Sequence, residues 1–285
     1  MSAPDFDVGA LGKPIRGPSA LDGDLRRFVH LTRTLAVSDF KLRFFGSVLG
    51  YFWQLMRPLL LFGVLYLVFT QAIKLGTSVR FYPAVLLTSI VLFTFFSEAT
   101  SGAVSSVIDR ENLVRKIQFP RLVIPTTVAL TAAFNLVLNF VVVLVFIFAT
   151  GVHVTKTWLE LPVLVGILGL FAMGMAMLLS ALFVRFRDVR PIWDVTLQIL
   201  FYASPVIYAI ETVDSATARH LIMLNPLGAI FQQVRHAVID QNAPTAAAAA
   251  GGWQWLLIPA AIVIGSALLG FWVFNREAPR IAEEL

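Results

Sequence analysis

The sequence predicts an all-α polytopic membrane protein, and composition and hydropathy are the first two reasons. Hydrophobic residues make up 58% of the 285 residues and charged residues only 14%. The mean hydropathy of +0.81 lies well above the range of globular proteins. Six segments are apolar over the ~20 residues needed to cross a bilayer. The predicted six-span domain covers 52–274, with transmembrane helices at 52–73, 83–103, 122–150, 161–184, 192–210 and 255–274.

The basic residues predict how these spans are oriented. Of the 22 lysine and arginine residues, 17 fall in the N-terminal arm with the start of the first span, the second-to-third and fourth-to-fifth connections, and the tail. Because connections rich in lysine and arginine stay on the cytoplasmic side, we expect both termini in the cytoplasm. Residues 1–20 are polar and rich in glycine and proline, which predicts a disordered cytoplasmic arm and no cleavable signal peptide. Residues 275–285 are the predicted cytoplasmic tail.

Residues 21–46 are predicted to form an amphipathic interface helix along the membrane surface. Asp24 is its expected N-cap. Two interpretations remain open: the helix is a basic headgroup anchor only, or it also contacts a soluble partner. Its apolar face is predicted to consist of Leu25, Phe28, Val29, Thr32, Leu35, Ala36 and Phe40.

The stretch NLVRKIQFPRLVIP, at 112–125, separates the second and third spans. It mixes basic and apolar side chains, and a purely solvated loop would not need the apolar ones. Pro120 and Pro125 fix the chain where it re-enters the membrane, because proline in a helix's first turn presets φ without losing a hydrogen bond. The pattern is typical of a short docking helix that is followed by a conformationally restricted, proline-containing segment. The alternative is a loop whose apolar side chains dip into the interface.

Three features inside the spans predict contacts between helices. Glu98 is the only acid well inside a span, and we expect it to hydrogen-bond across helices or to meet an arginine on the cytoplasmic side. Asn135 and Asn139 lie one helical turn apart and are expected to bond a neighbouring span. The fourth span carries small residues that allow close helix approach, at Gly166, Gly169 and Gly174.

Several kinds of chemistry are not expected of this chain. It has no cysteine and its four histidines are dispersed, so no thiolate or histidine metal site is predicted. No phosphate-binding loop of the form G-x-x-x-x-G-K-[ST] occurs, so any ATP must be bound by another subunit. A glycosyltransferase would need clustered carboxylates to hold a metal, and none are found. We therefore expect no catalytic residue, no metal and no cofactor bound by this chain.

Together, four stretches resemble the permease subunit of type-2 ABC exporters for polysaccharides and lipid-linked glycans, the family that exports O-antigen, teichoic acid, capsule and galactan. With the six-span layout, the similarity covers nearly everything after residue 20. Each motif alone is weakly specific because it is mostly apolar, whereas their order and spacing together are fairly specific. The stretches are LGYFWQLMRPLL (49–60), NLVRKIQFPRLVIP (112–125), NPLGAIFQQVRHAVID (225–240) and FNREAPRIAEEL (274–285).

The resemblance implies a transport subunit and not an enzyme. Two permeases assemble with two ATP-binding subunits in this family, so a second copy of the chain and an ATP-binding subunit that carries ATP and Mg²⁺ are expected partners. Two short re-entrant helices are implied on the outer side between spans five and six, within residues 205–240. The 112–125 stretch would be the coupling helix that inserts into the ATP-binding subunit. Its implied coupling residues are Leu113, Val114, Arg115, Lys116, Ile117 and Phe119.

The fifth span supplies the predicted substrate path. Pro205 should break this span, and broken backbone at membrane depth needs a cavity or protein to satisfy its polar groups. Aromatic faces suit sugar rings, so the candidates are Trp193, Phe201, Tyr202 and Tyr208; the alternative is an aromatic belt at the interface. Cytoplasmic arginines are expected to attract a pyrophosphate headgroup or to set topology alone. They are Arg43, Arg185, Arg187 and Arg190.

We therefore expect a permease subunit that exports a lipid-linked polysaccharide across the cytoplasmic (inner) membrane of a bacterium, in contact with membrane lipids and without nucleic acid. An ABC exporter permease for drugs or small lipids is one alternative. A membrane-embedded transferase that acts on a lipid carrier is the other. That enzyme would need an acid or base facing an outer cavity, and the acids near enough are Glu211, Asp214 and Asp240.

Overall fold

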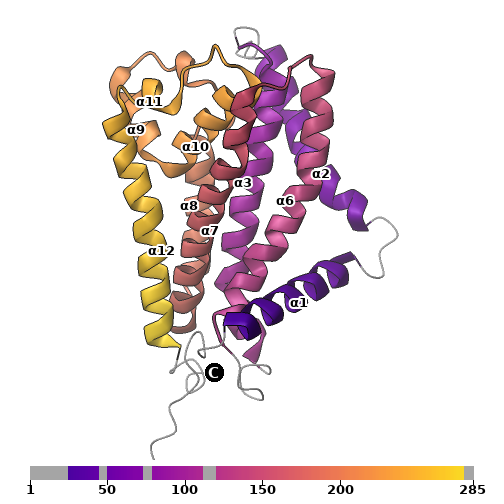
Figure 1. The fold of residues 1–285 in the computed structure, drawn as a ribbon, viewed down its shortest axis with the longest axis vertical. Helices are drawn as coiled ribbons and strands as arrows, with labels where there is room; N and C mark the ends of the chain where they lie inside the picture. Colours follow the sequence, from indigo (N-terminus) through magenta and orange to yellow (C-terminus); the bar gives the residue numbers. More distant parts are fainter. Residues whose placement is uncertain (1–24, 45–49, 73–78, 112–119, 279–285) are drawn as a thin grey trace, which may run out of the picture.

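The computed structural model describes residues 25–44, 50–72, 79–111 and 120–278. Within these ranges every regular element is a helix, and the long helices form a bundle (Figure 1). The longer helices are α1 (Leu25–Phe44), α2 (Gly50–Leu67), α3 (Tyr82–Val104), α6 (Val123–Ala149), α7 (Glu160–Arg185), α8 (Val189–Ala203) and α12 (Leu257–Glu277). Shorter helices are α4 (Ser106–Asp109), α9 (Ala216–Leu224), α10 (Pro226–Val234) and α11 (Ala246–Ala249). Short π or 3₁₀ turns are η2 (Val68–Ala72), η4 (Lys156–Leu159), η5 (Ile210–Thr212), η6 (Arg235–Ile239) and η7 (Trp253–Leu256).

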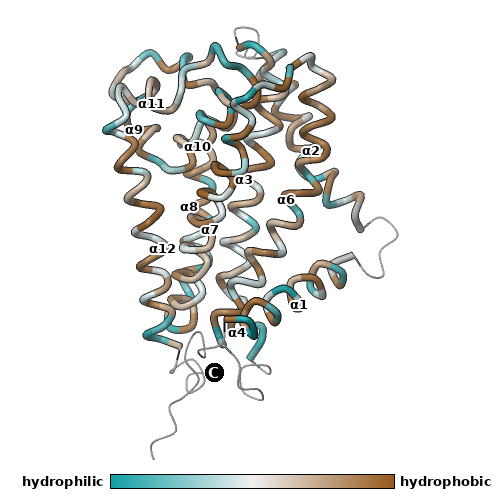
Figure 2. The backbone as a smooth tube through the Cα atoms, viewed as in Figure 1, coloured by the Kyte–Doolittle hydropathy of each residue, from teal (hydrophilic) through white to brown (hydrophobic). Residues whose placement is uncertain are grey.

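The helices α9, α10 and α11 mark one end of the bundle, drawn at the top of Figure 1 and called the upper end below. The opposite, lower end carries α1 and the last turn of α12. Hydrophobic residues follow the long helices, and hydrophilic residues gather on α1 and on the connections (Figure 2). Among the described residues, five segments are long and apolar enough to cross a membrane: Phe52–Gln71, Tyr82–Val104, Val123–Ala149, Lys156–Arg185 and Trp253–Glu277. They correspond to all the predicted spans except the fifth.

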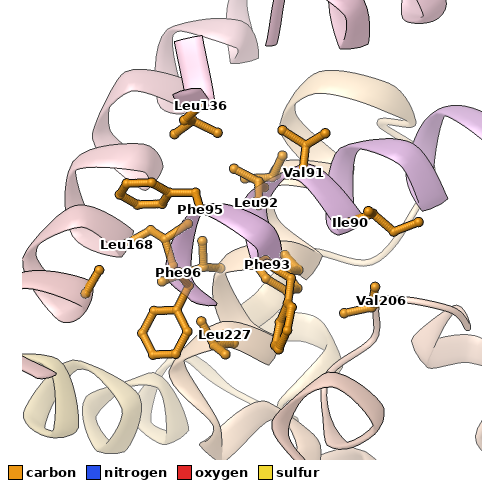
Figure 3. Close-up of a cluster of buried hydrophobic side chains, with 14 of the residues drawn as sticks. Ile90, Val91, Leu92, Phe93, Phe95, Phe96, Leu136, Leu168, Val206 and Leu227 are labelled. Carbon is orange, nitrogen blue, oxygen red and sulfur yellow. The ribbon is translucent and has the colours of Figure 1, made fainter. Parts of the chain in front are cut away.

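Helix α3 is the centre of the bundle. Of the residues in its apolar stretch 78% are buried, against 6% in the stretch that includes α2. Phe96 of α3 is fully buried and stacks on Phe171 of α7, with ring centroids 5.0 Å apart. Leu136 of α6, Leu168 of α7 and Leu227 of α10 belong to the same cluster of buried side chains (Figure 3). The neighbouring helices are therefore positioned against α3.

A polar contact joins three helices inside the bundle. Glu98 of α3 accepts hydrogen bonds from the Gln54 amide of α2 at 3.1 Å and from the Asn135 amide of α6 at 2.8 Å. The expectation that Glu98 and Asn135 bond across helices is confirmed. Asn139 instead donates to the backbone carbonyl of Asn135 in its own helix, at 3.0 Å. The Glu98 side chain is thus held by amide donors from two neighbouring helices.

Helices α7 and α12 approach closely at two glycines. A Cβ atom on Gly174 would meet the backbone nitrogen of Ala267 at 2.6 Å, and one on Gly270 would meet the carbonyl oxygen of Gly174 at 2.2 Å. The close approach predicted for Gly174 is confirmed. A Cβ on Gly166 or Gly169 would meet nothing within 4 Å, so these two residues do not support such an approach.

Helix α8 ends inside the fifth predicted span. It has 15 residues, and at 1.5 Å per residue it is about 22 Å long, shorter than the ~30 Å hydrocarbon core. Its last helical residue is Ala203, and Pro205 follows in a non-helical segment. The predicted break in the fifth span is therefore confirmed. Its physical reason is that proline has no backbone N–H to continue the hydrogen bonds of the helix.

Side chains from other elements hold the non-helical segment after α8. The Asn225 amide donates to the Ser204 hydroxyl at 2.9 Å. The Tyr82 hydroxyl, at the start of α3, donates to the backbone carbonyl of Ile207 at 2.8 Å. These contacts supply partners to polar groups near the point where the helical ladder of α8 ends.

Replacing Gly174 with alanine should destabilise the protein, because the added Cβ pushes α7 and α12 apart. Overpacking of this kind costs about 1–3 kcal/mol. The matched change Gly169→Ala, on the same helix, places its Cβ in open space and should be neutral or stabilising, because alanine favours a helix over glycine by about 0.5–1 kcal/mol. Thermal unfolding of the detergent-purified variants checks this difference. Equal melting temperatures for the two variants would contradict the close packing at Gly174.

Candidate functional site

A groove of about 550 Å³ lies between α2, α3 and α8. Helix α3 contributes Ser97 and Ser101, which are one helical turn apart and therefore on one face. Helix α8 contributes Asp194 and Gln198 with the same spacing. The groove thus has hydroxyl, amide and carboxylate groups on two facing helices. Its other lining residues are apolar or aromatic: Leu61, Phe93, Leu197, Phe201 and Tyr202.

The aromatic wall of this groove is built on α3 and α8. The Phe93 and Phe201 rings meet edge to face, with centroids 5.0 Å apart, and the Tyr202 ring meets Phe201 in the same way at 5.4 Å. Tyr202 is 64% exposed. The structure thus places two of the four predicted path residues, Phe201 and Tyr202, in the groove. An exposed aromatic ring beside polar groups suits a ligand with apolar C–H faces and many hydroxyls.

The other two predicted path residues lie outside the groove. Trp193 is only 6% exposed, and its indole N–H donates to the Thr100 hydroxyl of α3 at 3.1 Å. Tyr208 follows α8 and is half-buried against the main hydrophobic core. Their assignment to a substrate path stays a prediction.

Sequence analysis missed the polar residues of the groove. On α8, Asp194 and Gln198 are exposed, whereas Trp193 and Leu197, each one position earlier, are buried. The helix therefore turns one face to the core and the adjacent face to the groove. Polar residues four positions apart in an otherwise apolar segment share a helix face, and this spacing is the signal that could have identified them.

Three of the arginines predicted to recognise a headgroup lie around the turn between α7 and α8. Arg185, Arg187 and Arg190 are all exposed. The guanidinium of Arg187 lies 5.2 Å from the ring centroid of Phe183, a cation–π distance. This turn therefore presents three cationic side chains to the surroundings. The side chain of the fourth arginine, Arg43, lies outside the part of the chain that the structure describes.

The predicted coupling residues lie outside the described residues, but the elements that flank them are described. The chain enters the stretch through α4 and Arg110, and Arg110 forms an ion pair with Asp39 of α1. The described chain resumes at Pro120. The coupling residues that fall in the gap are Leu113, Val114, Arg115, Lys116, Ile117 and Phe119.

Helix α1 is attached to α6 beside this ion pair. Ala36 is fully buried, and its carbonyl oxygen lies 3.5 Å from the Thr131 hydroxyl, which donates to Thr127 of its own helix at 2.8 Å. The Phe40 ring meets the Phe134 ring edge to face, with centroids 5.7 Å apart. A cavity of about 430 Å³ remains between α1, α6 and the lower end of α3. One helix thus touches both the bundle and the residues that lead into 112–119.

Arg121, directly after Pro120, was not among the predicted site residues. It is buried, and its Nη1 atom has no hydrogen-bond partner among the described residues. Burial lowers the pKa of its guanidinium, which still carries a charge at neutral pH. Arg121 is thus a buried cation directly after the predicted coupling stretch.

Comparison with known proteins agrees with this layout. The family model of the ABC-2 type transporter matches residues 30–239. The chain is 30% identical over 224 residues to the O-antigen export system permease protein RfbA of Myxococcus xanthus, across 78% of this chain and 85% of the relative. It is 24% identical to two O-antigen export system permease proteins RfbA of Klebsiella pneumoniae, over 250 and 248 residues, across 87% of this chain and 92% of each relative.

Reversing the charge of Asp39 should loosen α1, because Arg110 would then face a like charge. We expect Asp39→Arg to lower the melting temperature, through a coupling of about 0.5–1 kcal/mol. The exchange of both charges, Asp39→Arg with Arg110→Asp, should restore it. Thermal unfolding of the two single variants and the double variant measures the coupling as a double-mutant cycle. Strictly additive effects would show that the ion pair does not hold α1.

Proposed function

The chain belongs to the ABC-2 type transporter family, and we propose that it is the permease subunit of an exporter that moves a lipid-linked polysaccharide from the cytoplasm to the outer side of the cytoplasmic membrane. One observation carries this proposal: relatives aligned over 78–87% of the chain are O-antigen export permeases. An O-antigen is a surface polysaccharide, so the substrate class follows from the relatives.

The groove on α8 supports a carbohydrate substrate. Tyr202 and Phe201 offer aromatic faces to sugar rings, and Asp194 and Gln198 offer acceptors and donors to their hydroxyls. Most of the lining is apolar or aromatic, as in ligand pockets generally, and the few polar groups set the specificity. The carboxylate and amide of Asp194 and Gln198 are the groups that favour a glycan over an apolar drug or small lipid.

The energy for transport is assigned to a separate ATP-binding subunit. The chain contains no phosphate-binding loop of its own, and the family is that of ABC transporters. We place the contact with that subunit at 112–125. The ion pair between Asp39 and Arg110 supports this placement, because it joins the interface helix α1 to the start of that stretch.

The transmembrane domain has six spans in this proposal, of which α8 and the residues after it form the fifth. The break at Pro205 is compatible with membrane depth, because Asn225 and Tyr82 supply hydrogen-bond partners to the segment that follows. Helices α9 and α10 have nine residues each, about 14 Å, and are too short to cross. We assign them as the two re-entrant helices of the outer side.

The lower end is assigned to the cytoplasm, with both termini there. This orientation places the exposed Arg185, Arg187 and Arg190 on the cytoplasmic side, as the positive-inside rule requires. In this position they are suited to attract the pyrophosphate of a lipid carrier. The exporter is expected in the inner membrane of a bacterium.

Two copies of the chain are expected to share the path. Only 6% of the residues in the apolar stretch that includes α2 are buried, and α2 forms one wall of the groove. A second copy packed on this side would enclose the groove, which a single chain leaves open. Two permeases and two ATP-binding subunits then complete the exporter.

Depleting the protein in its native cell tests the function. We expect the polymer to accumulate on its lipid carrier inside the cytoplasmic membrane, and less of it to reach the surface. Lipid-linked glycans extracted from that membrane and identified by mass spectrometry give the readout, with cells complemented by the unchanged gene as control. Normal glycan pools after depletion would reject polysaccharide export in favour of a smaller lipid or a drug.

Replacing Tyr202 with alanine should slow export in depleted cells that carry the variant. An aromatic contact is worth about 0.5–1.5 kcal/mol, so a several-fold lower rate of surface glycan delivery is expected. Ile199→Ala is the matched control, because Ile199 is exposed on α8 but does not line the groove. Equal delivery by both variants, at equal protein levels, would remove the groove from the path.

A further inference from the structure

A second polar cavity, of about 400 Å³, lies at the upper end of the bundle, apart from the groove. Three parts of the chain form it: the residues before α3, the turn η5, and η6 with the turn that follows. Its volume falls in the range of about 300–1,000 Å³ that is typical of small-molecule sites. The polar residues that line it are Arg80, Glu211, Thr212, Arg235, Asp240 and Asn242.

The Arg235 side chain fixes one wall of this cavity. Its Nη1 atom donates to the Glu211 carboxylate at 2.6 Å, and the side chain is only 7% exposed. Its Nε atom is buried and has no hydrogen-bond partner among the described residues. Because that atom is closed to the cavity, Arg235 positions Glu211, and the exposed Arg80 and Asn242 remain to donate hydrogen bonds to a ligand.

Asp240 supplies an acceptor in the same cavity. It is 7% exposed, and one carboxylate oxygen accepts the Asn242 backbone N–H at 3.2 Å. Within the described ranges no basic side chain forms an ion pair with it. The backbone N–H of Asp240 donates to the carbonyl of Arg235 at 2.9 Å, which closes a π-type turn. This turn brings both side chains to one cavity, and single π turns often mark functional sites.

A smaller cavity of about 180 Å³ adjoins the first and shares Arg80, Asp240 and Asn242 with it. It adds His153 to the polar lining. The Arg80 guanidinium lies 4.7 Å from the ring centroid of Phe81, whose backbone is left-handed with φ 54°. For a bulky residue this backbone is strained, and such strain collects at ligand sites.

The charges of the cavity identify the kind of ligand that fits. The guanidiniums of Arg80 and Arg235 balance the carboxylates of Glu211 and Asp240, so the lining has no net charge. A balanced set of donors and acceptors disfavours an anion and suits a neutral ligand with many hydroxyls. A metal ion is a poor match, because no group of three His, Cys, Asp or Glu side chains that could hold one occurs in the described part of the chain.

We propose that this cavity binds one neutral sugar residue of the glycan as it leaves the groove on the outer side. The inference rests on the proposed polysaccharide function and adds a second, separate carbohydrate site to it. Asp240 accepts sugar hydroxyls, the exposed guanidinium of Arg80 donates to a ring or hydroxyl oxygen, and Asn242 does both. A sugar held here resists backward movement of the polymer between ATP-driven steps.

Binding of simple sugars to the full-length chain in lipid nanodiscs tests the site. The probes are methyl α-glucoside, methyl α-mannoside and methyl α-galactoside, followed by saturation-transfer difference NMR. All proteins carry Tyr202→Ala, so that the groove contributes less to the signal. We expect millimolar binding of at least one probe, weakened about tenfold by Asp240→Asn, because hydrogen bonds to a charged acceptor are stronger than those to a neutral one.

Asp214→Asn is the matched control, because Asp214 is exposed on the same outer segment but does not line the cavity. No saturation transfer to any probe, or equal binding by the Asp240→Asn and Asp214→Asn proteins, would overturn the inference. Asp240→Asn keeps the shape of the side chain and the acceptor for the Asn242 N–H, and equal melting temperatures show that it folds. If it unfolds, Asn242→Ala replaces it with the same expected loss.

The two proposals can fail separately. Polymer accumulation on depletion without sugar binding at the cavity would reject only this site. Sugar binding that depends on Asp240, together with normal glycan pools on depletion, would keep the site and reject polysaccharide export.

Discussion

At membrane depth a polar group needs a partner inside the protein, and α3 meets this constraint with contacts to four parts of the chain. Glu98 takes amide donors from α2 and α6. Thr100 receives the indole N–H of Trp193 on α8, and Tyr82 donates to the backbone beyond α8. These contacts lie among fully buried apolar residues of the same helix, so each one fixes the place of a neighbour. The walls of the groove follow from where α3 holds α2 and α8.

The early end of α8 depends on the same contacts. A helix that stops at Ala203 leaves its last backbone carbonyls without helical partners. In the segment that follows, Tyr82 donates to the carbonyl of Ile207 and Asn225 donates to the Ser204 hydroxyl. This segment leads to η5, where Glu211 faces Arg235 in the outer cavity. The two carbohydrate sites proposed here therefore lie on either side of one interruption of one helix.

Hydropathy alone predicted the long apolar helices, because about 20 apolar residues in a row have few other structures open to them. The break at Pro205 was predicted from the proline itself, because proline has no backbone N–H to donate. Residue type alone did not show which side of α8 faces the groove. Trp193 was predicted to line the substrate path because it is aromatic, but its side chain contacts α3. Asp194, the next residue, lines the groove. The ion pair between Arg235 and Glu211 could not be predicted in the same way. Arg235 lies in the π turn η6, and the spacing of apolar residues in the sequence does not indicate such a turn.

Helix α3 also connects the two ends of the molecule. Its 23 residues extend about 34 Å. At the lower end it leads through α4 to Arg110, which holds Asp39 of α1, and at the upper end it is preceded by Arg80 of the outer cavity. Ser97 in the groove and Arg80 at the outer cavity therefore lie on or next to one helix. Trp193 ties α8 to this helix, and Gln54 ties α2 to it, so both walls of the groove are fixed relative to α3. Moving one wall against the other requires the Gln54–Glu98 or the Trp193–Thr100 hydrogen bond to break.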